Sequence, residues 1–181
     1  LSEMAEVRLS QWRELAHFVS DVVHLKVAGI DGHYASQIVF IAEDGSATSR
    51  VKRLAIMDQD GHNIRYLSDG SSIVLTPRFS PEGDEITYTE INSGRVRVIL
   101  RHLVTGQQEV LETAEGTSTF SPRFSPDGRG IVYSLALNGN TDIYYMDLQT
   151  RARERLTMDA SAETSPSISP DGRKVAFESD R

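Results

Sequence analysis

Ser125-Pro126-Asp127-Gly128 is one of three copies of the phrase Ser-Pro-acid-Gly, which also occurs at residues 80–83 and 169–172. The three serines lie 45 and 44 residues apart, a period typical of the four-stranded blades of a β-propeller rather than of helical repeats. Proline presets the backbone of a turn, serine can bond the backbone two residues on, and glycine accepts a left-handed conformation. We therefore predict that the chain reverses direction at each copy.

Strands are predicted on both sides of each turn, because apolar or aromatic residues alternate there. They precede the turns at 77–79, 122–124 and 166–168, and they follow them at 86–88, 131–133 and 175–177. A third strand is predicted at 54–58, 98–102 and 143–147. A fourth ends on Leu67, Leu111 and Leu156, each nine positions after the third strand. One register therefore runs through each blade.

The outermost strand of the third blade is crowded with charge, from Arg151, Arg153, Glu154 and Arg155. Charged side chains on an edge strand discourage pairing with another molecule. We predict that these residues form an exposed edge.

The array of blades is incomplete. Residues 38–41 match the second strand of a blade, but residues 30–36 carry no Ser-Pro-acid-Gly turn before it, and the sequence ends just after the second strand of a fourth blade. About three and a half blades are therefore expected. Propeller rings usually contain at least four, so we expect these residues to be part of a longer chain whose strand beyond Arg181 completes the first blade.

Residues 10–28 differ from the repeats and predict an amphipathic helix that Ser10 caps and Gly29 ends. Its apolar residues recur at three- and four-residue steps, at Trp12, Leu15, Ala16, Val19, Val22 and Val23. One helix cannot form a core alone, so we expect it to close a separate preceding domain, with residues 30–36 as the joint. The alternative is that it packs on the flank of the propeller.

Composition narrows the class of function. With 39% hydrophobic and 25% charged residues, the sequence is that of a globular protein, and no apolar run is long enough to cross a bilayer. The net charge of −7 would repel phosphate backbones and anionic lipid, so we expect neither nucleic acid nor direct membrane insertion. There is no cysteine, which excludes disulfides and thiol chemistry.

Motifs that carry chemistry are weak in this sequence. The acidic stretch Asp58–Asn63 has glycine at its fourth position and Asp69 at the twelfth, which does not fit a helix-flanked calcium loop, so we predict a hairpin turn there. The five histidines form no His-x-x-x-His pair, and neither a Gly-x-Ser-x-Gly elbow nor a glycine-rich phosphate loop occurs. We predict no catalytic residue, metal or cofactor.

The most specific part of the sequence is the helix segment Ala16-His17-Phe18-Val19-Ser20-Asp21 followed by the joint Gly29-Ile30-Asp31-Gly32. Together with Ile38-Val39-Phe40, the blade repeats and Tyr144-Tyr145-Met146-Asp147-Leu148, it resembles the TolB family, periplasmic components of the Tol-Pal envelope system. The resemblance implies an α/β N-terminal domain, whose last helix and joint are residues 1–34, and a six-bladed propeller, of which residues 35–181 form part.

The resemblance also implies a function. Members of this family are non-enzymatic periplasmic scaffolds that maintain outer-membrane integrity and support cell division. They bind the lipoprotein Pal through the propeller mouth and TolA through an N-terminal region that is absent from this sequence, and bacteriocins such as colicins use the same surfaces. The mouth would be lined by the residues that lead into each inner strand, namely Leu75, Thr76, Ser118, Thr119, Phe120, Ser121, Glu163, Thr164 and Ser165.

Two points stay open at the level of sequence. Phe120 is an aromatic residue in a polar segment and is either an interface hot spot or a buried blade residue. The Ser-Pro-Asp-Gly repeat also occurs in other propellers, so the alternative function is the propeller of a prolyl-oligopeptidase-like or tricorn-like serine peptidase, which filters substrates for a catalytic domain elsewhere.

Overall fold

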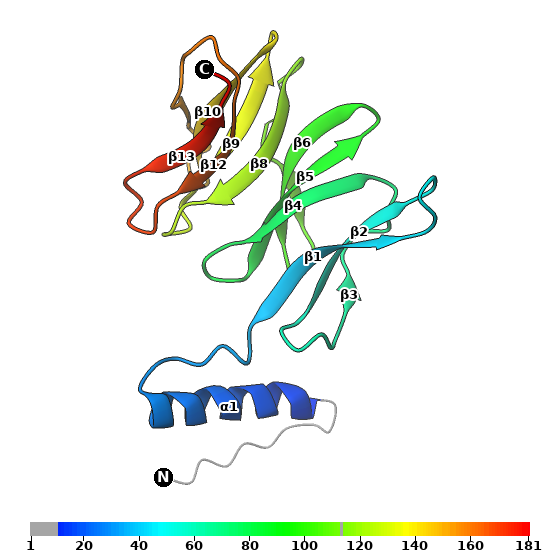
Figure 1. The fold of residues 1–181 in the computed structure, drawn as a ribbon, viewed down its shortest axis with the longest axis vertical. Coiled ribbons are helices and arrows are strands. Elements are labelled where there is room, and N and C mark those ends of the chain that lie inside the picture. Colours follow the sequence, from blue (N-terminus) through cyan, green and yellow to red (C-terminus); the bar gives the residue numbers. More distant parts are fainter. Residues whose placement is uncertain (1–10, 113) are drawn as a thin grey trace. The chain divides into compact units, whose positions relative to one another are not determined.

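The computed structural model of the protein describes residues 11–112 and 114–181 (Figure 1). These residues contain one helix and thirteen strands, which confirms the predicted mainly β fold. The chain divides into two compact units. Among the described residues, the larger comprises 39–54, 67–112 and 114–181, and the smaller comprises 11–38 together with 55–66.

The helix α1 runs from Trp12 to Ala28 in the smaller unit. Gln11 occupies the N-cap position without a side-chain capping bond, and Ser10, the predicted cap, lies outside the described residues. Gly29 ends the helix as predicted, because its left-handed backbone (φ 73°) lets its N–H donate to the carbonyl of Leu25 at 2.9 Å. No helix among the described residues is both long and apolar enough to cross a lipid bilayer.

Four sheets follow one another along the chain, and every predicted strand is present. The first sheet has three strands and, as predicted, no inner strand: β1 (Gln37–Asp44), β2 (Val51–Asp58) and β3 (Arg65–Tyr66). The second comprises β4 (Ile73–Phe79), β5 (Glu85–Asn92), β6 (Arg95–His102) and β7 (Gln108–Val110). The third comprises β8 (Ser118–Phe124), β9 (Gly130–Leu137), β10 (Asn140–Asp147) and β11 (Arg153–Arg155). The last contains β12 (Glu163–Ile168) and β13 (Val175–Ser179), which are antiparallel.

The outermost strands are short, and each ends one residue before its predicted leucine. Each leucine nevertheless continues the pairing, because its N–H donates to a carbonyl of the neighbouring strand, which is β2, β6 or β10. These bonds join Leu67 to Leu54 at 2.7 Å, Leu111 to Val98 at 3.1 Å and Leu156 to Ile143 at 2.8 Å.

The Ser-Pro-acid-Gly turns form as predicted, but the serine plays a different part. Ser125 does not bond the backbone two residues on. Its hydroxyl donates to the carboxylate of Asp127 at 2.6 Å and accepts from the N–H of Gly130, five residues on, at 2.9 Å. Ser169 repeats both bonds with Asp171 and Lys174, and Ser80 makes the same pair with Asp84 and Glu85. The serine therefore closes the whole hairpin.

Two apolar cores lie between successive sheets of the larger unit. One joins Leu54 of the first sheet to the second sheet, through Val74, Ile86, Tyr88 and Ile99. The other joins the second sheet to the third and consists of Val98, Leu100, Leu111, Ile131, Tyr133, Leu135 and Met146. Burial of side chains between stacked sheets is the main stabilising contribution in such an array.

The charged edge of the third sheet is exposed at Arg151, Arg153 and Glu154, as predicted, and Arg155 is partly buried. The sequence did not predict that Arg151 and Arg153 also form ion pairs, with Glu109 on β7 and with Glu112 just after that strand. Arg155 pairs with Asp142 on the neighbouring strand at 2.7 Å. Arg151 and Arg153 therefore link segments that the sequence places about 40 residues apart, whereas the pair of Arg155 lies within the third sheet.

Candidate partner-binding site

The nine predicted mouth residues, listed above from Leu75 to Ser165, lie within strands and not in the loops before them. They occupy the first halves of β4, β8 and β12, the first strand of each of the last three sheets, here called the inner strands. The prediction that they lead into the strands is therefore corrected. The strands begin earlier than expected because Ile73, Ser118 and Glu163 already pair with the second strand of their sheets.

Each inner strand carries the same local distortion. Thr76, Ser121 and Ser165 have left-handed backbones, with φ of 49°, 53° and 55°, and each precedes a proline. The pairing register shifts at the same three places, so each strand contains a β-bulge. A left-handed residue other than glycine costs about 1 kcal/mol or more, and bulges re-aim side chains beside functional sites.

Hydrogen bonds between sheets hold the bulge of β8 in place. The N–H of Ser121 donates to the hydroxyl of Thr89 on β5 at 3.2 Å, and the same hydroxyl lies 3.1 Å from that of Thr76. The hydroxyl of Thr119 accepts from the N–H of Val98 on β6 at 2.8 Å. The first half of β8 is therefore fixed by the sheet before it, which gives the mouth residues a rigid base.

Burial separates the nine residues into three groups. Thr119 and Glu163 are 1% and 0% exposed, so they lie inside the sheets and are not available at the surface. Both carboxylate oxygens of Glu163 lack a hydrogen bond among the described residues, and the nearest cation, Arg181, lies 3.5 Å away. Thr76 and Ser165 are exposed, and the remaining five residues are partly buried.

Phe120 is partly buried on β8, opposite Ser134 of β9. It does not belong to either apolar core, whereas Phe124, four residues later on the same strand, packs against the core between the second and third sheets. The two phenylalanines therefore differ in environment. Phe120 lies outside the cores and is only partly buried, so part of its surface stays accessible next to Ser121.

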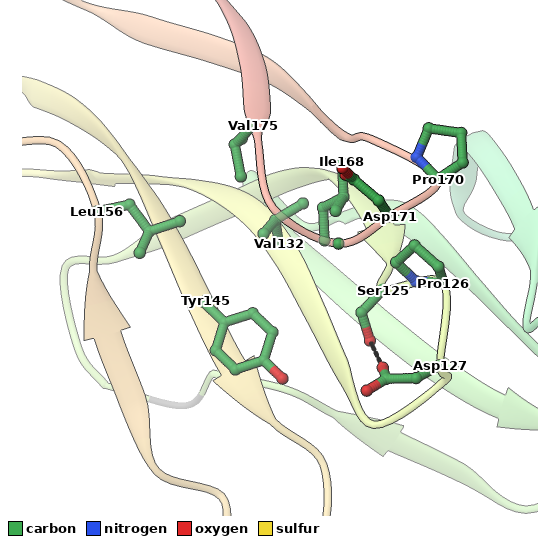
Figure 2. A pocket seen from close by; sticks show the side chains of 11 residues that line it. Ser125, Pro126, Asp127, Val132, Tyr145, Leu156, Ile168, Pro170, Asp171 and Val175 are labelled. Atoms are coloured by element: carbon green, nitrogen blue, oxygen red, sulfur yellow. Dashed lines mark hydrogen bonds between the residues drawn. The ribbon is translucent and has the colours of Figure 1, made fainter.

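A pocket of about 550 Å³ lies between the third sheet and the β12–β13 pair (Figure 2). Tyr145 and Leu156 line one side, and Ile168 and Val175 line the other. The equivalent residues one repeat earlier are Leu100, Leu111, Phe124 and Ile131. They form a packed core together with Met146 of β10 and with Leu148, which follows that strand. The pocket is thus a packing space between sheets, and we assign it no ligand.

The smaller unit contains a clamp that the sequence did not reveal. The carboxylate of Asp21 on α1 accepts hydrogen bonds from the N–H groups of Tyr34 and Ala35 in the joint, at 2.7 and 3.0 Å. Gly32 passes so close that a Cβ there would lie 2.3 Å from Asp21 Oδ1. In the sequence, the only indication of this contact is that Asp21 and Gly32 both belong to the segment that resembles the family.

A second polar cluster in the smaller unit surrounds Asp60, at the turn between β2 and β3. Its carboxylate pairs with Arg13 of α1 and lies 3.3 Å from His17 Nε2. Partial burial acts to raise the pKa of Asp60, but the N–H of His62 and the charge of Arg13 outweigh it, so that the pKa is lowered.

The stretch Asp58–Asn63 forms the predicted hairpin turn, closed by the N–H of Asp58 donating to the carbonyl of His62 at 2.9 Å.

Comparison with known proteins assigns most of the chain to one family. The family described as "TolB beta propeller domain" matches residues 24–181. The Tol-Pal system protein TolB of Dinoroseobacter shibae is 48% identical over 156 residues, which cover 86% of this chain and 35% of that protein. The chain thus spans about a third of the length of this relative.

Solved structures agree on the fold. The crystal structure of TolB from Acinetobacter baumannii superposes with a TM-score of 0.85 at 32% identity, covering all of this chain and 45% of that one. The crystal structure of the tricorn protease superposes with a TM-score of 0.58 at 17% identity. The match covers 80% of this chain and 14% of the protease chain. At that identity the likeness concerns the fold alone.

Proposed function

The chain belongs to the TolB family, and on that premise we propose that it serves as a non-enzymatic periplasmic scaffold of the Tol-Pal system. Its proposed partner is the lipoprotein Pal, bound on the first halves of the inner strands. TolA is proposed as a second partner of the whole protein, and bacteriocins as competitors for the same surfaces. The role would be to maintain outer-membrane integrity and to support cell division.

The observation that carries the Pal proposal is the bulge that recurs on β4, β8 and β12. It places a Thr or Ser with a left-handed backbone at the same position of three successive strands, and hydrogen bonds to the neighbouring sheet hold one of these bulges rigidly. A rigid surface loses little conformational entropy when it binds a partner. Strained residues of this kind cluster at binding sites.

The mouth residues take different parts in this proposal. Thr76 and Ser165 are exposed and would contact Pal directly, together with the accessible portions of Leu75, Ser118, Phe120, Ser121 and Thr164. Thr119 and Glu163 are buried and would not contact Pal directly. The hydroxyl of Thr119 would act by holding β8 against β6. Phe120 is proposed as the aromatic anchor, since aromatic residues are enriched among interface hot spots.

The experiment is a calorimetric titration of the full-length protein with Pal, using Phe120→Ala and the matched control Phe124→Ala. Phe120→Ala should weaken binding about tenfold or more, as expected for a hot spot, and leave the melting temperature within about 2 °C of the wild type, because Phe120 lies outside both cores. Phe124→Ala should lower the melting temperature by several degrees, because it removes core packing.

Two results would count against the proposal. If the wild-type protein does not bind Pal at micromolar concentration, Pal is not the partner. If Phe120→Ala binds as tightly as the wild type, the aromatic anchor lies elsewhere. The peptidase alternative has no supporting observation of its own, because the tricorn likeness concerns the fold alone.

A further inference from the structure

Two arginines occupy the same position of successive inner strands. Arg78 on β4 and Arg123 on β8 each follow the proline that comes after the left-handed residue of the bulge. Both strands are edge strands of their sheets, and they contact one another. The third copy of the repeat has Ser167 at this position, so the positive charge is confined to the first two.

Neither guanidinium has an anionic partner among the described residues. Arg78 Nη1 donates to the carbonyl oxygen of Pro77 at 2.7 Å, and Arg123 Nη1 donates to that of Pro122 at 3.0 Å. These bonds use only one nitrogen of each guanidinium. Other arginines of the larger unit pair with carboxylates, as Arg97 does with Glu90 and Arg155 with Asp142. Arg78 and Arg123 therefore have donors to spare.

The charge of Arg78 also acts on Arg123. Partial burial and then the neighbouring charge of Arg78 lower the pKa of Arg123. Two adjacent cations without an anion are unfavourable, and the arrangement is unusual in a chain whose net charge is −7. A carboxylate placed between them would relieve this repulsion and would satisfy the free N–H groups, since the guanidinium fork matches a carboxylate.

We propose that Arg78 and Arg123 form a binding site for an acidic side chain, an aspartate or glutamate, of the protein partner that docks on the inner strands. The inference rests on the proposed function for the identity of that partner. The arginines lie two residues beyond Thr76 and Ser121 along their strands, so the acidic side chain would reach past the mouth residues. It would fix the register of the partner, and the bulges would supply the surrounding contacts.

The first experiment measures Pal binding by calorimetry over a series of salt concentrations. Arg78→Gln and Arg123→Gln should each weaken binding about tenfold, the effect expected from losing a charge-assisted hydrogen bond. The double variant should also show a smaller dependence of affinity on salt. Arg173→Gln is the control, because Arg173 lies on the exposed turn between β12 and β13, at the opposite end of those strands from Glu163.

The outcomes separate this site from the proposed function. If the double variant binds Pal like the wild type at every salt concentration, the arginine site is overturned and the Pal proposal stands. If Arg173→Gln weakens binding as much as the double variant does, the effect is one of net charge and the site is likewise overturned. Weaker Pal binding in Arg78→Gln, Arg123→Gln and the double variant, with unchanged binding in Arg173→Gln, supports the site.

A second experiment does not depend on Pal. The side-chain Nε–Hε signals of Arg78 and Arg123 are followed by NMR while the full chain is titrated with the peptide acetyl-Glu-Glu-amide, and acetyl-Gln-Gln-amide serves as the neutral control. Shifts of both signals that saturate at millimolar concentration with the acidic peptide alone support the site, even if Pal does not bind. Signals that do not move, or that move equally with both peptides, overturn it.

Discussion

Gly32 lies against the carboxylate of Asp21, and a Cβ on Gly32 would approach Asp21 Oδ1 to 2.3 Å and Asp21 Cα to 2.8 Å. The same carboxylate accepts the N–H groups of Tyr34 and Ala35. The glycine is thus required for space, since it has no left-handed backbone to explain it. These contacts, together with the ring contact between His24 and Tyr34, hold the joint against the middle of α1.

Gly32→Ala should therefore destabilise the joint by about 1–3 kcal/mol, the range for overpacking in a tight site. The expected signs are faster limited proteolysis between residues 30 and 36 and a lower melting temperature. The control is Gly32→Ala in an Asp21→Ala background, where the carboxylate is gone and the additional loss should be smaller. Equal losses in both backgrounds would show that Asp21 does not set the requirement for glycine.

Tyr133→Phe should stabilise the protein. Tyr133 is fully buried, and its hydroxyl has no hydrogen-bond partner in the part of the chain that the structure describes. Removing an unsatisfied buried hydroxyl should gain about 1 kcal/mol at neutral pH, which corresponds to about 2–4 °C in the melting temperature. Tyr88→Phe is the control, because that hydroxyl donates to Gln108 at 3.4 Å and its loss should not stabilise.

The same residue predicts a pH dependence. Burial, and after it the charge of Glu112, raises the pKa of Tyr133 from 10.0 to about 12. Between about pH 10 and 12 the Tyr133 hydroxyl therefore stays protonated in the folded state but is deprotonated in the unfolded state. The free energy of unfolding should fall as the pH rises through this range. At pH 11 the loss should be about 1 kcal/mol. Denaturant titrations of wild type and Tyr133→Phe at pH 8 and pH 11 test this, and an identical loss in both proteins would contradict it.

The hairpin serine should matter for stability in proportion to its burial. Ser125 is 8% exposed, and without its hydroxyl the buried N–H of Gly130 would lose its partner. Ser125→Ala should therefore cost about 1–3 kcal/mol, measured by chemical denaturation. Ser93→Ala, at an exposed turn, should change stability by less than about 0.5 kcal/mol. A similar small effect at Ser125 would mean that water replaces the hydroxyl.

The two ion pairs between the second and third sheets should differ in strength. Glu112 is largely buried, with a side chain 10% exposed, whereas Glu109 is 47% exposed. Glu112→Gln should cost about 1–3 kcal/mol and be little affected by salt, while Glu109→Gln should cost about 0.5 kcal/mol and lose its effect as salt is added. Melting curves at low and high salt check this ranking. A salt-sensitive effect at Glu112 would contradict the assigned burial.

The repeated turns are the part of the fold that sequence reasoning predicted well. Proline fixes φ at about −65°, glycine permits the positive φ that ends each turn, and alternating apolar residues define strands, so these signals act within a few neighbouring residues. They were sufficient for the strands on either side of Ser80, Ser125 and Ser169. They did not predict the bond from the serine hydroxyl to the N–H five residues on, which exists only once the hairpin has closed.

The candidate site was predicted less completely. The sequence located the inner strands, but not the left-handed backbones of Thr76, Ser121 and Ser165, because a residue before proline is expected to be extended. Only the pairing with the second strand and the bonds from the neighbouring sheet impose that conformation. The juxtaposition of Arg78 and Arg123 was missed for the same reason, since their separation of 45 residues gives no sign that β4 and β8 touch.

By itself, then, the sequence determined the blades, their period and the TolB resemblance, because turn chemistry and hydrophobic alternation are local properties of the chain. Only the tertiary structure decided which polar residues are accessible, which of them carry strain and which charges lack partners. Those properties depend on contacts between residues that are far apart in the sequence. Glu163 illustrates the difference, since a glutamate predicted to line the mouth is 0% exposed.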